Sequence, residues 1–172
     1  DGHGSGPLSG TLEVTTEDSA TNVTVLTGTE ATTVNTGSVA GGTVAVQADE
    51  LANDTTLDLN GKARITVDDL KGNIVASDMS GGALRVNTVD DSDTNTNDDD
   101  IAITTGNTDV YINTTGSNDL VEVNASGMAG STELFLGGTS TVEVTGLVRD
   151  LDANGEVDPF GVSDLTMLTG DL

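Results

Sequence analysis

The chain contains an internal repeat. Residues 43–75 align with residues 120–152 without a gap, at a constant offset of 77. Identical aligned pairs include Val44 and Val121, Val46 and Val123, Ala48 and Ala125, Thr55 and Thr132, Leu57 and Leu134, Leu59 and Leu136, Gly61 and Gly138, Val67 and Val144, and Leu70 and Leu147. Repetition at a fixed spacing is typical of stacked, extended folds, so it favours a scaffold over a catalyst.

Shorter matches extend the repeat in both directions. Residues 23–28 match residues 101–106 at an offset of 78. Residues 11–16 match residues 83–88 at an offset of 72, and residues 163–169 resemble the start of the first copy. The sequence therefore divides into a linker or entry strand at 1–10, a first repeat unit at 11–82, a second at 83–162 and the start of a third at 163–172.

Short runs of alternating apolar and polar residues, separated by Gly, Asn, Asp and Ser, predict β-strands. The alternation places apolar side chains at i and i+2, which a strand directs to one face. The predicted strands are residues 11–15, 22–26, 31–35, 43–47, 55–59, 63–67, 73–76, 83–87, 101–104, 109–113, 119–123, 132–136, 140–144 and 164–168. Helix signals are nearly absent, and residues 48–53 are too short to form more than a turn.

The spacing of these strands fits two all-β folds. Strand starts recur every roughly eight to twelve residues, which suits a β-sandwich or a solenoid with two short strands per coil. The repeat favours the second, a parallel β-solenoid or β-roll built from two tandem units of about 77 residues. Two tandem β-sandwich domains remain the alternative.

The composition restricts the core to small aliphatic side chains. Only three residues are aromatic, Tyr111, Phe135 and Phe160, and there is no Trp or Cys. Folding must therefore depend on many small contacts spread along the chain. The predicted core residues are Val44, Val46, Leu57, Leu59, Ile65, Val67, Val121, Val123, Leu134, Leu136, Val142 and Val144.

The charge of the chain excludes some partners and suggests others. With 29 acidic and 5 basic residues the formal net charge is −24, so nucleic acid and anionic membranes would be repelled. A chain so acidic should be stabilised by cations that screen its self-repulsion. Specific calcium sites and general adaptation to high salt both explain such acidity, and the sequence leaves both open.

Two Gly and Asp segments precede apolar strands in the second unit. Residues 106–110 (GNTDV) are followed ten positions later by residues 116–120 (GSNDL), which places Asp109 and Asp119 at equivalent steps. In a stacked parallel fold, such carboxylates and turn carbonyls would offer oxygen ligands suited to Ca²⁺. Ordinary polar turns between strands are the alternative interpretation.

These segments resemble the Gly- and Asp-rich repeats of RTX proteins, and the chain as a whole resembles the degenerate β-strand repeats of RTX-type S-layer proteins and giant bacterial adhesins. The resemblance implies a calcium-stapled parallel β-roll on the cell surface. This chain departs from the family pattern GGxGxDxUx because it has single glycines and a ten-residue step. In the first unit, Gly28 and Gly37 lack the Asp that should follow.

Two further acidic segments are candidate calcium sites. Residues 150–158 (DLDANGEVD) begin like an EF-hand or dockerin loop, with Gly155 at the sixth position, but the twelfth position is Gly161 instead of an acid. The candidate ligands there are Asp150, Asp152, Asn154 and Asp158. Residues 90–100 contain six more, Asp90, Asp91, Asp93, Asp98, Asp99 and Asp100. A polar turn between repeats is the alternative for the first of these segments, and a solvated loop is the alternative for the second.

The sequence offers little for catalysis. His3 is the only histidine, and no nucleophile elbow, phosphate-binding loop or dinucleotide motif is present. Carboxylates are abundant, but a glycosidase also needs a sugar platform that aromatic residues usually help to supply. We therefore expect a protein that is not an enzyme.

Together these features predict an extracellular structural repeat segment of a cell-surface protein of the S-layer, adhesin or fibre kind. Its acidic turns would bind Ca²⁺, and its partners would be further copies of itself or neighbouring repeats of a longer chain, with no membrane insertion. Two alternatives remain, a self-assembling filament subunit that donates its amino-terminal strand and a glycan-binding β-solenoid.

Overall fold

The computed structural model describes most of the chain. It describes residues 10–16, 22–38, 41–89, 100–117, 119–129 and 132–147, and the backbone of residues 164–168. In these ranges the secondary structure is all β, and no helix occurs that is long and apolar enough to cross a membrane.

The described strands form two parallel sheets. Sheet A contains, in spatial order, β1 (Leu12–Thr15), β3 (Thr32–Asn35), β5 (Thr56–Asn60), β7 (Asn73–Val75), β9 (Ile101–Thr104), β11 (Val121–Asn124), β13 (Thr141–Thr145) and β14 (Asp164–Leu168). Sheet B contains β12 (Leu134–Gly137), β10 (Asn107–Gly116), β8 (Ser80–Val89), β6 (Arg64–Leu70), β4 (Thr43–Gln47) and β2 (Asn22–Leu26).

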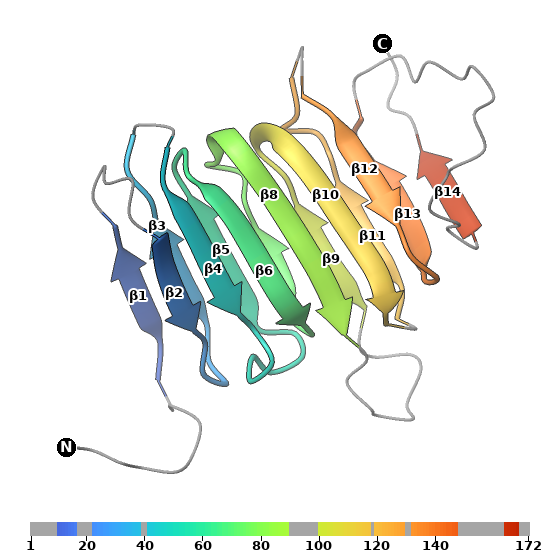
Figure 1. Ribbon diagram of the computed structural model, residues 1–172. Helices are drawn as coiled ribbons and strands as arrows, with labels where there is room; N and C mark the ends of the chain where they lie inside the picture. The colour runs from blue at the N-terminus through green and yellow to red at the C-terminus, as the bar shows by residue number, and fades with distance from the viewer. Residues whose placement is uncertain are drawn as a thin grey trace.

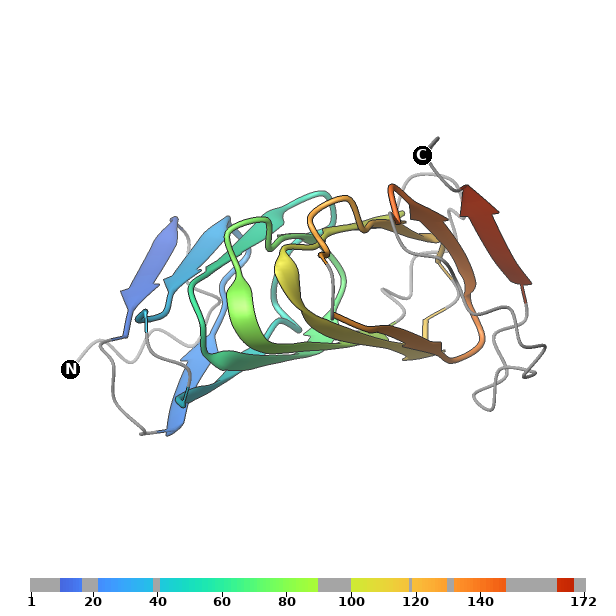
Figure 2. The ribbon, with the colours of Figure 1, turned by 90° about the horizontal axis from the view of Figure 1, so that it is seen from above.

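From β1 to β13 the chain alternates between the two sheets, so two successive strands make one coil. Val23 pairs with Val44 and Val44 pairs with Ile65, so residue numbers advance by 21 per coil in this region. One sheet lies behind the other, and together they enclose a flattened interior (Figures 1 and 2). The fold is a parallel β-solenoid, as predicted, and each strand overlaps a segment in which alternation predicted one.

The interior consists of aliphatic ladders that run along the solenoid. In sheet B, Val46 pairs with Val67 and Val67 with Val86, and all three are buried. All twelve predicted core residues lie in the hydrophobic core or pack against it. Leu134 and Leu136 are only half-buried, because β12 is the edge strand of sheet B and has no neighbour on its far side among the described strands.

The sequence repeat exchanges the two sheets. Val44 of β4 lies in sheet B, whereas its aligned residue, Val121 of β11, lies in sheet A. The two strands are seven places apart in the chain, and with two strands per coil this corresponds to three and a half coils. Repeat-equivalent residues therefore lie on opposite sides of the solenoid, and β6–β8 and β7–β9 pairing joins the two units in continuous sheets.

A corner built on Thr36 shows what the repeat preserves. The Thr36 hydroxyl donates a hydrogen bond to the Asn60 carbonyl (2.8 Å) and accepts one from the Ala63 amide (3.2 Å). Gly61 lies between them with φ of +105°, and a Cβ there would come within 2.3 Å of Thr36 Oγ1. Only glycine fits this corner, because both the backbone conformation and the space exclude a side chain.

The second unit builds the same corner in the other sheet. The Thr114 hydroxyl donates to the Gly137 carbonyl (3.3 Å) and accepts from the Ser140 amide (3.1 Å). Gly138 has φ of +121°, and a Cβ there would also lie 2.3 Å from the Thr hydroxyl. The repeat thus encodes one corner geometry that serves either sheet.

We predict that Gly61→Ala destabilises the protein more than Gly81→Ala. Gly61 has φ of +105° and Gly81 has φ of +110°, but at Gly81 the nearest atom to an added Cβ, in the Lys62 side chain, is 4.0 Å away. Gly81→Ala should therefore lower the free energy of unfolding by about 1–2 kcal/mol, through backbone strain alone. Gly61→Ala should lower it by about 1–3 kcal/mol more, because the added Cβ also overlaps with Thr36. Denaturant unfolding of both variants measures the difference, and equal losses would contradict the corner packing.

Repeat-equivalent threonines give a second prediction. The buried Thr27 hydroxyl has no hydrogen-bond partner among the described residues, whereas the buried hydroxyl of its equivalent, Thr105, donates to the Asn124 carbonyl (3.3 Å). We expect Thr27→Val to stabilise the fold by about 1 kcal/mol, because it removes an unsatisfied polar group. Thr105→Val should destabilise it by about 0.5–1.5 kcal/mol. Thermal unfolding of the two variants checks the opposite signs.

Candidate functional site

Most of the predicted calcium ligands lie outside the described residues. These are Asp90, Asp91, Asp93, Asp98, Asp99, Asp150, Asp152, Asn154 and Asp158. Asp100 is described and is exposed immediately before β9. The structure therefore gives no geometry for the two acidic segments, and calcium binding there stays a prediction.

Asp109 and Asp119 are described, and they do not lie together. Asp109 is in β10 near its start, and Asp119 follows the end of the same strand, about 30 Å of extended chain away. The Asp109 carboxylate accepts a hydrogen bond from the Glu133 amide (3.1 Å), and the Asp119 carboxylate accepts one from the Ser117 hydroxyl (2.8 Å). Asp109 therefore stabilises the start of β12, and Asp119 stabilises the turn after β10.

No metal centre is apparent in the described ranges. Among their side chains there is no group of three or more His, Cys, Asp or Glu that could hold a metal ion. The candidate functional surfaces in this part of the molecule are instead the outer faces of the two sheets, where alternate strand residues point to solvent.

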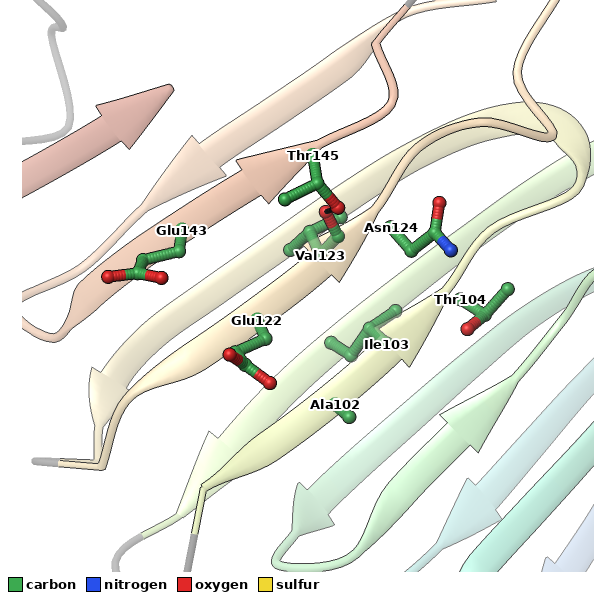
Figure 3. Close-up of a pocket in the computed structure, with 8 residues that line it drawn as sticks. All are labelled: Ala102, Ile103, Thr104, Glu122, Val123, Asn124, Glu143 and Thr145. Atoms are coloured by element: carbon green, nitrogen blue, oxygen red, sulfur yellow. Dashed lines mark hydrogen bonds between the residues drawn. The ribbon is translucent and has the colours of Figure 1, made fainter. Parts of the chain in front are cut away.

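The outer face of sheet A carries a shallow hollow across β9, β11 and β13 (Figure 3). Its volume is about 160 Å³. Ala102, Glu122 and Glu143 follow one another across the three strands, and the small Ala102 side chain leaves space beside the two carboxylates. Thr104, Asn124 and Thr145 form a parallel polar row, also shown in Figure 3.

The two glutamates form an unusual lateral pair. Glu122 pairs directly with Glu143 in the register of β11 and β13. It is the only pair of two charged residues that the described strand registers place side by side, and like charges directly opposite each other destabilise a sheet. The hollow therefore concentrates negative charge that would attract a cationic group.

The outer face of sheet B carries charges of both signs. Arg64 and Arg85 are exposed there, on the adjacent strands β6 and β8. The Asp68 carboxylate on this face is held by neighbours, because it accepts hydrogen bonds from the side-chain amides of Gln47 (3.2 Å) and Asn87 (2.6 Å). These hydrogen bonds leave the carboxylate charged, so β6 and β8 present the two arginines together with Asp68 and Asp69.

Two of the three aromatic residues stack on the same face. The rings of Tyr111 and Phe135 are parallel within 5°, with centroids 4.6 Å apart, and the Arg85 guanidinium lies 4.5 Å from the Tyr111 centroid on the other side. Both faces of Tyr111 are thus covered. Only the outer face of Phe135 is free of this stack.

Sequence reasoning missed both surfaces. Alternation alone places Arg85, Tyr111 and Phe135 on outward positions, but only the pairing of β8, β10 and β12 brings them side by side. The same holds for Glu122 and Glu143, whose proximity depends on the register of β11 and β13.

We predict a favourable coupling between Tyr111 and Phe135. A double-mutant cycle with Tyr111→Ala and Phe135→Ala should give a coupling energy of about 0.5–1.5 kcal/mol, the usual range for stacked aromatic pairs. Chemical unfolding of the two single variants and the double variant measures it. A coupling of zero would show that the rings do not stack in solution.

The chain was compared with protein-family models, with curated proteins and with solved structures, and none of them matches it.

Proposed function

We propose that this chain is an extracellular structural repeat segment of a cell-surface protein of the S-layer, adhesin or fibre kind, stabilised by calcium at its acidic segments. The observation that carries the proposal is the pair of continuous parallel sheets, whose aliphatic ladders run from coil to coil. Each coil packs mainly on the coils next to it, as in other solenoids, so the architecture provides length and stiffness.

The distribution of polar groups supports a structural role. On the outer faces, side chains on successive strands bond to one another: the Asn60 amide donates to Asn35 (3.0 Å), and the Asn113 amide donates to Asn87 (3.3 Å). These contacts link neighbouring coils from outside at two places, while the aliphatic ladders link the coils from inside. Hydrogen bonds on the surface thus reinforce the stack in addition to the packing of the interior.

The charge supports the calcium part of the proposal. A net charge of −24 on 172 residues opposes compaction, and Asp is concentrated in residues 90–100 and 150–158. Extracellular calcium modules bind with dissociation constants of about 10⁻⁴–10⁻³ M, which suits folding after export into a calcium-rich medium. Binding to the folded state alone would stabilise it by mass action.

The test is thermal unfolding followed by circular dichroism at constant ionic strength. We expect calcium to raise the midpoint more than sodium does, because divalent binding at 100 times the dissociation constant contributes about 2.7 kcal/mol. Equal stabilisation by sodium chloride at matched ionic strength would contradict specific calcium binding and would indicate a salt-adapted scaffold.

Matched variants locate the effect. Asp90→Asn with Asp91→Asn and Asp93→Asn should reduce the calcium-specific gain, and so should Asp150→Asn with Asp152→Asn and Asp158→Asn. The control neutralises three exposed acids away from both segments, with Glu30→Gln, Asp49→Asn and Glu50→Gln. If the control lowers the gain as much as the other two variants, calcium acts through net charge alone.

A further inference from the structure

The alternation between the two sheets is interrupted once among the described strands. From β1 to β13 successive strands belong to different sheets, but β13 and β14 follow each other and are neighbours in sheet A. Between them the alternation calls for a strand of sheet B, and its place would be beside β12, the last described strand of that sheet. Residues 148–163, which lie between these two strands in the chain, are outside the described residues.

The internal repeat shows what a neighbour of β12 would cover. The offset of 77 aligns Leu57 and Leu59 of β5 with Leu134 and Leu136 of β12. The first two leucines are fully buried, whereas the second two are only half-buried. On the far side of β5 lies β7, whose Ile74 pairs with Leu57 and is 1% exposed. Among the described strands, β12 has no counterpart of β7.

The same offset identifies a segment of this chain as that counterpart. It aligns β7 with residues 150–152, and Ile74 with Leu151. Leu151 lies between Asp150 and Asp152, so the segment has one aliphatic position flanked by two polar ones. This is the pattern of a short strand with one buried face.

The chain also leaves β13 in the way in which it leaves β6. Asp69, near the end of β6, has φ of +59°, and its aligned residue, Gly146, has φ of +69°. Each is followed by a buried leucine, Leu70 and Leu147. The turn that directs the chain from β6 to β7 in the opposite sheet is therefore repeated at the end of β13.

One position departs from the alignment. Arg149 aligns with Gly72, where a Cβ would lie 2.5 Å from the Thr55 carbonyl oxygen, so the corner after β13 must be wider than its equivalent. The chain has length for this, because residues 146–163 connect β13 to β14, whereas residues 71–79 connect β6 to β8 and include β7.

We propose that residues 150–152 pair with the free edge of β12 as a further parallel strand of sheet B, with Leu151 in the interior beside Leu134. The strand would extend the aliphatic ladder in which Leu84, Val110 and Leu134 already follow one another. It would also satisfy backbone groups that an edge strand leaves unpaired. The inference goes beyond the structural role proposed above and does not depend on calcium.

Engineered disulfides test the pairing, since the chain has no cysteine of its own. Thr56 of β5 pairs with Asn73 of β7, so the aligned residues Glu133 and Asp150 should pair as well. Adjacent strands lie about 4.8 Å apart, within the Cα–Cα range of a disulfide, about 4.4–6.8 Å. Glu133→Cys with Asp150→Cys should therefore form a disulfide within one folded chain on mild oxidation, located by peptide mapping.

Glu143→Cys with Asp150→Cys is the matched control. These two positions are closer in sequence, but Glu143 lies on the outer face of sheet A, on the other side of the solenoid from β12 (Figure 3). In dilute protein, the Glu133 variant should oxidise at least about tenfold faster than the control, because pairing raises the effective concentration of its two thiols. A segment with no fixed position would favour the control, whose shorter loop closes more readily.

Two results of this experiment would overturn the proposal. The control could oxidise as fast as the Glu133 variant or faster. Alternatively, the disulfide of the Glu133 variant could form only between chains, which would assign the edge of β12 to a second copy. Circular dichroism verifies that both variants fold.

Hydrogen exchange of the original chain tests the same pairing without any substitution. The Val110 amide donates to the Glu133 carbonyl, so in this parallel pair the Leu134 amide faces away from β10 and toward the added strand. It should be protected at least about a hundredfold more than the amide of Glu50, an exposed residue outside the strands. Equal protection of the two amides would contradict the added strand.

Discussion

In-register parallel pairing is the constraint on which this structure depends. It places each residue beside the residue of the same step in the next coil, so interior positions form ladders and Val67 lies between Val46 and Val86. The same rule acts on the surface, where charges of one sign would be stacked and would repel one another. Asp68 avoids this because Gln47 and Asn87 flank it and donate hydrogen bonds to its carboxylate.

In the other described strand pairs, no two residues of like charge are paired in register. The Glu122–Glu143 pair is the exception. The repeat supports the same view. The aligned positions of the first unit are Ala45 and Thr66, which carry no charge. The interior and the corners are therefore shared by both units, whereas the outer faces have diverged at these positions.

Local patterns were sufficient to predict the strands and their inward sides, because period-two alternation is a property of each segment by itself. The solenoid was favoured because repetition at a fixed spacing is typical of stacked folds, and the structure decides against the tandem β-sandwiches that the sequence left open. The pairing could not be predicted, since the connections vary in length: the step from Leu57 to its partner Ile74 is much shorter than the step from Ile74 to its partner Ile103. For that reason the sequence alone could not predict two surface features: the row of Arg85, Tyr111 and Phe135, and the hollow beside Ala102.

The exchange of sheets between repeats has a consequence for longer arrays. If further units followed with the same offset, any feature placed on the front of one unit would reappear on the back of the next, related by half a rotation about the long axis. An array of this kind would have no distinct upper and lower side. Such an array could contact neighbours on both sides through the same surface residues. A layer built from a single type of chain needs this property.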